Sequence, residues 1–78
     1  MLGVMADLRK DFPKRLRFAR EMRELTQAQL GRQAEIDQTV IAHFEAGSRL
    51  PGAENLRALA KGLMVSADYL LGLSERVS

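Results

Sequence analysis

The segment from residue 27 to residue 47 reads QAQLGRQAEIDQTVIAHFEAG and predicts two short helices joined by a tight turn. Thr26, just ahead of it, is a good N-cap residue, and Gln29 follows three positions later. This is the capping-box arrangement, in which two side chains satisfy free N–H groups at a helix start. Leu30 and Ala34 lie four residues apart and share one face, as in an amphipathic helix. The first helix of the pair is therefore expected over residues 27–34.

The second helix is expected to begin after Asp37, another N-cap residue, and to end at residue 45 or 46. Its apolar Ile41 and Phe44 lie three residues apart, whereas its other side chains are mostly polar or small. Gly47 follows, and glycine commonly ends a helix in the left-handed conformation. The pattern predicts a helix with one buried edge and one edge presented outward.

The order and spacing of these residues resemble the lambda-repressor-like helix-turn-helix family, of the Xre and phage-repressor type. The likeness covers about residues 13–73. Besides the positions above, it is carried by Ile36, Glu45, Pro51, Glu54, Leu56, Leu59, Ala60 and the run VSADYLLG from Val65 to Gly72. The resemblance implies an all-α fold, a compact five-helix domain in which the second and third helices form the helix-turn-helix.

We expect this domain to occupy residues 12–73, between an N-terminal extension of residues 1–11 and a tail of residues 74–78. The first helix is predicted to run from Pro13 to about residue 24, because proline suits a first helical turn. A fourth helix should follow Gly52, with Leu56, Leu59, Ala60 and Leu63 in the core. A short fifth helix should follow the N-cap residue Ser66.

The two chain ends carry separate expectations. Phe18 and Met22 lie off the buried face of the first helix, and the extension, which includes Leu2, Val4, Met5 and Leu8, is apolar enough to cover them. It would do so either as an extra turn of helix or across a dimer partner. At the other end, residues 76–78 are expected to fray.

Three turns depart from the family pattern. Glu24, Glu35 and Met64 stand where the family commonly has glycine. A non-glycine residue in the left-handed conformation costs about 1–2 kcal/mol. Either these turns are strained or their geometry differs from the usual one. Gly31, by contrast, occupies the position where the family needs a small residue so that the two helices approach closely.

Composition restricts the class of protein. Its 78 residues allow one small domain, and with no cysteine and a single histidine neither disulfides nor a thiol or histidine metal cluster is expected. No apolar run approaches the roughly 20 residues that span a bilayer, and the N-terminus does not read as a secretory signal. We therefore expect a soluble cytoplasmic, nucleoid-associated protein without a cofactor or metal.

Positive charge gathers in one segment. The formal net charge is only +2, but residues 9–23 contain seven basic and two acidic residues, a local balance of +5. Such a basic sector suits a phosphate backbone. The alternative is an ordinary solvated helix face.

The resemblance also assigns roles on the second helix of the pair. A helix of this kind enters the major groove, where each base pair shows a distinct set of donors, acceptors and methyl groups. Base contacts are expected from Gln38, Thr39 and His43, with Val40 and Ala42 close behind. Gln38 suits adenine, Thr39 can donate or accept, Val40 suits a thymine methyl, and His43 can donate to guanine or to a phosphate.

Phosphate contacts are expected from a second set of residues, and the resemblance implies that one of them also braces Gln38. The bracing residue is Gln27 at the start of the first helix of the pair. The phosphate set comprises Gln27, Ser48, Arg49, Arg15 and Arg17, with Arg32 a weaker candidate.

Two structural contacts complete the prediction. The resemblance implies an ion pair between Arg20 and Glu45, whose alternative is two surface charges that never meet. One such domain covers only a few base pairs, so specificity normally requires a two-fold dimer on a palindrome. Tyr69, Leu71 and Leu73 are more apolar residues than one short helix needs, and they are expected to form the homodimer contact.

These features favour a small dimeric transcriptional regulator, most often a repressor in this family, that binds a palindromic operator in double-stranded DNA. An activator, a restriction–modification controller and an antitoxin share this binding mode and stay open, as does a protein partner such as an antagonist or toxin. A protein-interaction module that has lost DNA binding would carry acids on the recognition face, and residues 38–43 contain none. An enzyme is the weakest alternative, because no nucleophile, base and orienting residue recur at a recognisable spacing.

Overall fold

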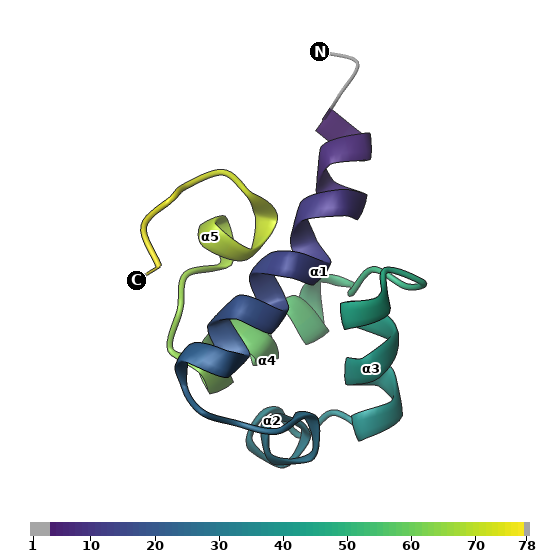
Figure 1. Ribbon diagram of the computed structural model, residues 1–78, viewed down its shortest axis with the longest axis vertical. Helices are drawn as coiled ribbons and strands as arrows, with labels where there is room; N and C mark the ends of the chain where they lie inside the picture. The colour runs from purple at the N-terminus through teal and green to yellow at the C-terminus, as the bar shows by residue number, and fades with distance from the viewer. Residues whose placement is uncertain (1–3, 78) are drawn as a thin grey trace.

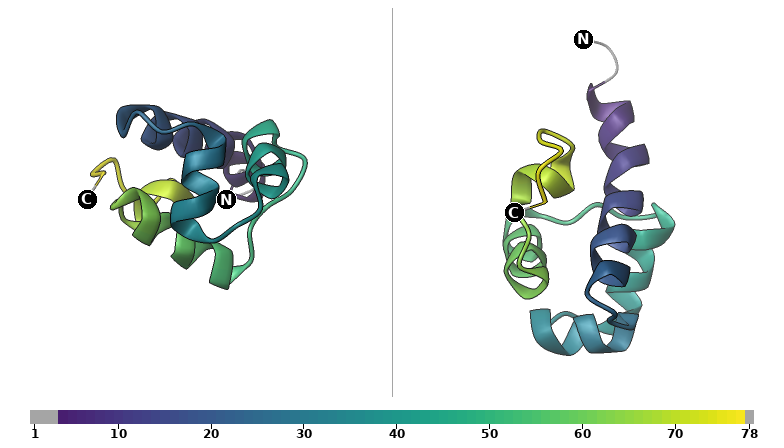
Figure 2. Two further views of the ribbon diagram at one scale, coloured as in Figure 1. Left: turned by 90° about the horizontal axis from the view of Figure 1, so that it is seen from below. Right: turned by 60° about the vertical axis from the view of Figure 1, so that its left-hand side comes forward.

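The computed structural model describes residues 4–77, with side chains from residue 8 onward. This part of the chain folds into five helices, which are α1 (Val4–Met22), α2 (Gln27–Ala34), α3 (Gln38–Ala46), α4 (Ala53–Leu63) and α5 (Ala67–Leu71). Helix α1 runs through the middle, with α3 packed on one side and α5 on the other (Figure 1). Helix α2 crosses one end and contacts both α3 and α4 (Figure 2). The all-α, five-helix prediction is confirmed.

The helix pair at the centre of the sequence begins and ends where the side chains predict. Thr26 Oγ1 accepts from the backbone N–H of Gln29 at 3.0 Å, and Gln29 Oε1 accepts from the N–H of Thr26 at 2.8 Å. Asp37 Oδ1 accepts from the N–H of Thr39 at 2.8 Å. Gly47 ends α3 with φ of +82°. Hydrogen bonds between neighbouring residues therefore define where α2 and α3 begin, and Gly47 defines where α3 ends.

The predicted start of α1 at Pro13 is wrong, because the helix begins at Val4 and runs through the proline. Proline inside a helix removes one hydrogen bond and costs about 3 kcal/mol. Burial of Phe12 opposes this cost. Its side chain is fully buried, and its ring meets Phe44 edge-on with the centroids 6.2 Å apart. The apolar stripe of α1 extends back to Leu8, which packs against the core, so the helix has no break at residue 11.

The expectations for the chain ends also need correction. The extension continues α1 away from Phe18 and Met22, which stay 49% and 66% exposed, so it does not cover them within the chain. Leu2 lies outside the described residues, and the side chains of Val4 and Met5 are likewise undescribed. The tail does not fray at residues 76 and 77, because Ser66 donates to both of their carbonyls, at 2.8 Å from its N–H to Val77 O and at 3.5 Å from its hydroxyl to Arg76 O. Ser78 lies outside the described residues.

The core lies between α1 and the other helices. Thirteen apolar residues are buried in one cluster, and Leu56 and Ala60 pack against it with partial burial. The cluster comprises Phe12, Leu16, Ala19, Leu30, Ala34, Ile36, Ile41, Phe44, Leu59, Leu63, Val65, Tyr69 and Leu70.

Glu24, Glu35 and Met64 all adopt the left-handed conformation. These turns are therefore strained, and their geometry does not differ from the usual one. The φ angles of Glu24, Glu35 and Met64 are +56°, +57° and +59°. At Glu35 this conformation aims the N–H of Ile36 at Gly31 O, 2.9 Å away. Gly31 is needed at that point, since a Cβ there would lie 2.6 Å from Ile36 O. The positive φ of Glu35 and the absence of a Cβ at Gly31 therefore both allow the turn that sets the angle between α2 and α3.

A buried carboxylate joins α1 to α3. Glu45, near the end of α3, has a side chain only 2% exposed, and Arg20 of α1 binds both of its oxygens at 2.6 Å and 3.0 Å. Gln27 adds a third hydrogen bond to Glu45 from the first residue of α2, at 3.2 Å. The hydrogen bond to Glu45 raises the pKa of Arg20 above its ordinary value, whereas burial lowers it, so the guanidinium stays charged. The predicted ion pair is confirmed, and it fastens three helices together.

Three more arginines, two in α1 and Arg23 just after it, bind backbone carbonyls at the ends of other helices. Arg15 donates to Tyr69 O in α5, and Arg17 donates to Glu45 O in α3. Arg23 donates to Leu63 O and Met64 O at the end of α4. The last carbonyls of a helix have no partner within it and carry partial negative charge, which a guanidinium satisfies. Much of the basic sector of α1 therefore holds the fold together.

The strain in the α2–α3 turn yields the first prediction. Glu35 is exposed and sits at positive φ, so Glu35→Gly should raise the free energy of unfolding by about 1 kcal/mol by removing the steric cost of the side chain. Urea unfolding followed by circular dichroism measures the change. The control is Lys14→Gly at an exposed position inside α1, which should lower stability by about 1 kcal/mol. Loss of stability in Glu35→Gly would contradict this account of the turn.

The ion pair yields the second prediction. Arg20→Met should lower the free energy of unfolding by about 3 kcal/mol or more, because it strands the Glu45 carboxylate in the interior. Arg17→Met is the matched control. Arg17 reaches the same carboxylate at 3.7 Å from a side chain that is 55% exposed, so its removal should lower stability by less than about 1 kcal/mol. Urea unfolding measures both changes. Equal losses of stability in the two variants would show that burial of the Arg20–Glu45 pair does not determine its contribution to stability.

Candidate nucleic-acid interface

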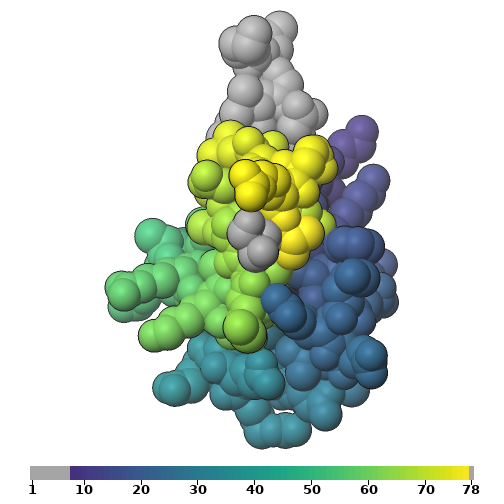
Figure 3. Space-filling view, turned by 90° about the vertical axis from the view of Figure 1, so that its left-hand side faces the viewer, coloured from purple at the N-terminus to yellow at the C-terminus, as the bar shows by residue number. Residues whose placement is uncertain are grey.

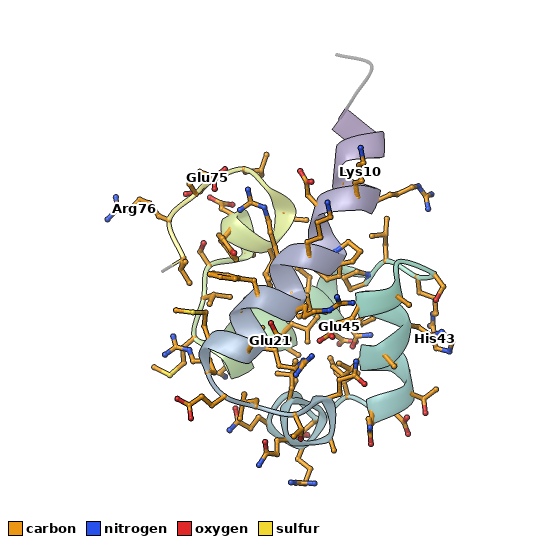
Figure 4. All side chains as sticks on the ribbon, viewed as in Figure 1. Lys10, Glu21, His43, Glu45, Glu75 and Arg76 are labelled. Carbon is orange, nitrogen blue, oxygen red and sulfur yellow. The ribbon has the colours of Figure 1, made fainter. Side chains whose placement is uncertain are left out.

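Helix α3 presents one face to solvent and buries the other. Ile41 and Phe44 are in the core, and Glu45 points inward toward α1, whereas His43 points outward from the domain (Figure 4). The five predicted base-contacting residues lie off the buried stripe. Gln38, Thr39 and His43 are exposed, while Val40 and Ala42 are half-buried. An exposed helical edge with amide, hydroxyl, imidazole and small apolar groups has the size and chemistry that a major groove accepts.

The exposed face of α3 carries no free negative charge. Glu45 is the one acid between residues 38 and 52, and it is buried against Arg20. Asp37 and Glu35 lie just before the helix, and the Asp37 carboxylate caps it. The outer face of α3 therefore does not repel a phosphate backbone.

The side chain of Gln27 makes a different contact from the one that the resemblance implies. Its Nε2 donates to Glu45 Oε1 at 3.2 Å, so it braces the end of α3. Among the described residues no hydrogen bond joins Gln27 to Gln38. The expectation that Gln27 braces Gln38 is therefore wrong, and Gln27 braces Glu45 instead. Gln27 remains half-buried at the first position of α2.

Arg15 is used inside the fold. Its guanidinium donates to Tyr69 O at 3.1 Å and Ser74 O at 3.2 Å, pairs with Glu75 at 2.9 Å, and lies 4.8 Å from the centre of the Tyr69 ring. Glu75 lies across α1 from His43 (Figure 4). These contacts leave Arg15 on the wrong side for a duplex that meets α3, and we remove it from the phosphate set.

The remaining phosphate candidates lie near α3. Arg17 is more than half exposed beside the C-terminal end of α3, and Arg49 is exposed in the loop that follows. Ser48 is exposed in the same loop, but it is engaged with His43. Its Oγ lies 3.0 Å from His43 Nδ1 and donates to His43 O at 3.3 Å.

The expected dimer contact contains one residue that cannot take part. Tyr69 is 6% exposed, with its ring under Arg15, so it offers a partner almost no surface. Leu71 is half-buried and Leu73 is 73% exposed. Figure 3 shows the face formed by α4, α5 and the C-terminal residues beside the end of α1. The correction leaves Leu71 and Leu73 as candidates.

Two structural residues were missed from the sequence. Phe12 continues the spacing of Leu16 and Ala19 along one helical stripe, a signal that the proline hid. Arg23 binds the end of α4, a contact between residues forty positions apart that no local pattern indicates.

Among the side chains that the structure describes, from residue 8 to residue 77, no three or more histidine, cysteine, aspartate or glutamate residues cluster in a way that could bind a metal ion. Over the same part of the chain, no helix has both the length and the apolar character needed to cross a bilayer.

Comparison with known proteins gives consistent results. Residues 14–75 match a family described as a helix-turn-helix domain. The chain is 38% identical over 58 residues to repressor protein C2 of Salmonella phage P22, covering 74% of this chain and 27% of that protein. It is 32% identical over 68 residues to the HTH-type transcriptional activator BcrR of Enterococcus faecalis, covering 87% of this chain and 33% of that protein. The chain thus spans a third or less of these relatives.

Two solved structures of the P22 C2 repressor have the same fold. The solution structure of its DNA-binding domain matches with a TM-score of 0.75 and 36% identity over 82% of this chain and 87% of that one. The crystal structure of the repressor with synthetic operator 9T matches with a TM-score of 0.76 and 35% identity over 81% and 96%. One of these relatives is a repressor and the other a transcriptional activator. Sequence pattern, fold and these likenesses agree, and the chain belongs to the lambda-repressor-like helix-turn-helix family of transcriptional regulators.

Proposed function

We propose that this domain binds double-stranded DNA by placing α3 in the major groove and acts as a regulator of transcription. The observation that carries the proposal is the outer face of α3, which is polar, free of acids and held rigidly by the buried contact between Arg20 and Glu45. The likeness to a repressor crystallised with its operator supports the same mode. In this motif the N-terminal residues of the second helix meet base edges while the first helix crosses the backbone.

The base-contacting set is Gln38, Thr39, Val40, Ala42 and His43. Gln38 lies at the start of α3 and is exposed, which suits a paired contact with N6 and N7 of adenine. Ala42 is small enough to let the helix approach the bases closely. These five residues extend along α3 from its first residue to His43 in its last turn.

The phosphate set is Gln27, Ser48, Arg17 and Arg49. Gln27 sits at the N-terminus of α2, where free N–H groups and the helix dipole favour an anion. Arg17 contacts Glu45 near the C-terminal end of α3, Arg49 is exposed in the loop that follows, and the two supply the cations. Such contacts position a domain on the duplex and make its affinity fall with salt.

We propose that the domain acts as a homodimer on a palindromic operator. Two-fold pairing would place the two α3 helices in successive major grooves, about 34–36 Å apart. Leu73 is among the most exposed large apolar residues described and follows α5 directly, with Leu71 beside it. A further apolar groove of about 410 Å³ lies between α4 and α5, lined by residues that include Leu56, Ala60 and Val65. Leu73 and this groove both offer apolar surface to a partner.

Repression is the regulatory outcome we propose, because a bound operator excludes polymerase. The named relatives include both a repressor and an activator, and an antitoxin or a restriction–modification controller would use the same face. An interaction module without DNA binding is disfavoured by the absence of acids from residues 38–43.

Selection from a random duplex pool at fixed salt tests the proposed function. The wild type should enrich a palindromic sequence, and Gln38→Ala should weaken discrimination at one base pair by about 1–3 kcal/mol. Arg49→Ala should weaken all duplexes alike and reduce the slope of log affinity against log salt by about 1. Arg57→Ala, an exposed arginine on α4, removes the same charge and should leave that slope unchanged. Absence of any enriched sequence would refute DNA reading.

Sedimentation equilibrium tests the dimer. Leu73→Asp should yield monomers, because a carboxylate would have to be buried in the contact. Met64→Asp is the matched control, since Met64 is similarly exposed, at 70%, but lies in the α4–α5 turn. A wild type that remains monomeric would refute the dimer, and a Leu73→Asp variant that dimerises normally would exclude this surface.

A further inference from the structure

The N-terminal turns of α1 project beyond the other helices (Figure 1). The helix begins at Val4, whereas the match to the helix-turn-helix family begins at residue 14, so these turns are an addition to the family segment. Leu8 packs against the core with partial burial, which anchors the added helix as far back as that residue. Arg9 comes next and is exposed. An anchored turn of helix therefore presents a cation to solvent.

Arg9 lies on the side of α1 that faces the C-terminal end of α3. Arg9, Pro13 and Arg17 are spaced four residues apart and share one face of the helix. Pro13 is buried, and a Cβ on Gly47 would lie 3.6 Å from its Cγ. Arg17 donates to Glu45 O at 3.4 Å. Arg9 stands one turn beyond Pro13, about 6 Å along the helix axis, and therefore lies beside the loop that begins at Gly47.

Arg9 extends a row of cations that the proposed function already assigns to phosphates. Arg17 lies on the same face of α1, and its side chain is 55% exposed. Arg49 is exposed in the loop that begins at Gly47, and Gly47 lies against Pro13. The three guanidinium groups therefore border the same end of α3, two from α1 and one from the loop. A DNA strand, which carries one charge per about 3.4 Å of helix axis, can meet several of them at once.

The carboxylates on the part of α1 whose side chains are described lie away from this row. Asp11 faces the end of α5, where its Oδ2 would lie 3.9 Å from a Cβ placed on Gly72. Glu21 lies toward the opposite end of α1 from Lys10, the neighbour of Arg9 (Figure 4). Neither of these two carboxylates is placed to neutralise Arg9.

We propose that Arg9 binds a backbone phosphate of the duplex beside those bound by Arg17 and Arg49, so that the projecting turns of α1 lengthen the DNA interface. The inference rests on the proposed function, because it requires a duplex against α3. A guanidinium binds a phosphate through paired N–H donors. Phosphates carry no sequence information, so Arg9 adds affinity without changing which base pairs are preferred.

The salt dependence of binding to the duplex that the wild type selects tests this contact. Arg9→Ala should weaken binding and reduce the slope of log affinity against log salt by about 1. Its deficit relative to the wild type should therefore shrink by about three- to fourfold between about 50 and about 200 mM salt. Arg9→Lys keeps the charge and should keep the wild-type slope. The sequence selected from the random pool should be the same for all three proteins.

Arg76→Ala is the matched control for the loss of one charge. Arg76 is exposed in the tail and lies across α1 from His43, so this variant should keep the wild-type slope (Figure 4). Arg9 is exposed, and urea unfolding of Arg9→Ala should match the wild type, which excludes misfolding as the cause of weaker binding.

Two results would overturn the inference while leaving DNA binding intact. One is an unchanged slope in Arg9→Ala when Arg49→Ala lowers it, and the other is an equal reduction in Arg9→Ala and Arg76→Ala, which would reflect net charge alone. A wild type that selects no duplex would overturn the proposed function and the inference together.

Discussion

The Glu45 carboxylate is buried near the end of the helix that would read DNA, and it needs Arg20 to be there. Two hydrogen bonds from the guanidinium and one from Gln27 satisfy it. An unpaired charge at this depth would be strongly destabilising, so the three helices that supply these groups have little freedom to move apart. The angle of α3 follows from this constraint together with the Glu35 turn, whose backbone geometry sets the approach of α2.

Helix α1 packs between the other helices, and its arginines, with Arg23 just after it, explain the concentration of positive charge in residues 9–23. Arg15, Arg17 and Arg23 donate to carbonyls in or just beyond the last turns of α5, α3 and α4, while Arg20 binds the buried carboxylate. The three carbonyl contacts each bring a charged donor to a helix end, where the last carbonyls have no partner within the helix. Four of the seven basic residues between residues 9 and 23, which in sequence suggest a phosphate site, thus make contacts within the domain. The charge left for a phosphate backbone near α3 comes mainly from the exposed parts of Arg17 and Arg49.

Local hydrogen bonding made much of this fold predictable. The capping box at Thr26 and the caps of α3 depend on residues within a few positions of one another, and they define the helix pair as the sequence indicates. Contacts across long separations were not predictable in this way. Pro13 concealed the true start of α1, because the burial of Phe12 that offsets it depends on Phe44. The exposure of Gln38, Thr39 and His43 follows from their positions on α3, but the contacts of Arg15 could not be predicted, since its partners lie more than fifty residues away.

The central claim is that the contact between Arg20 and Glu45 aims α3 as well as stabilising the domain. The most direct test is the dissociation constant of Arg20→Met for the duplex that the wild type selects, measured at a temperature where circular dichroism shows the variant fully folded. Arg20 is largely buried between helices and is assigned no contact with DNA. If the contact sets the angle of α3, the folded variant should bind its duplex more weakly than the wild type. An unchanged dissociation constant would mean that the core and the turns alone position the helix.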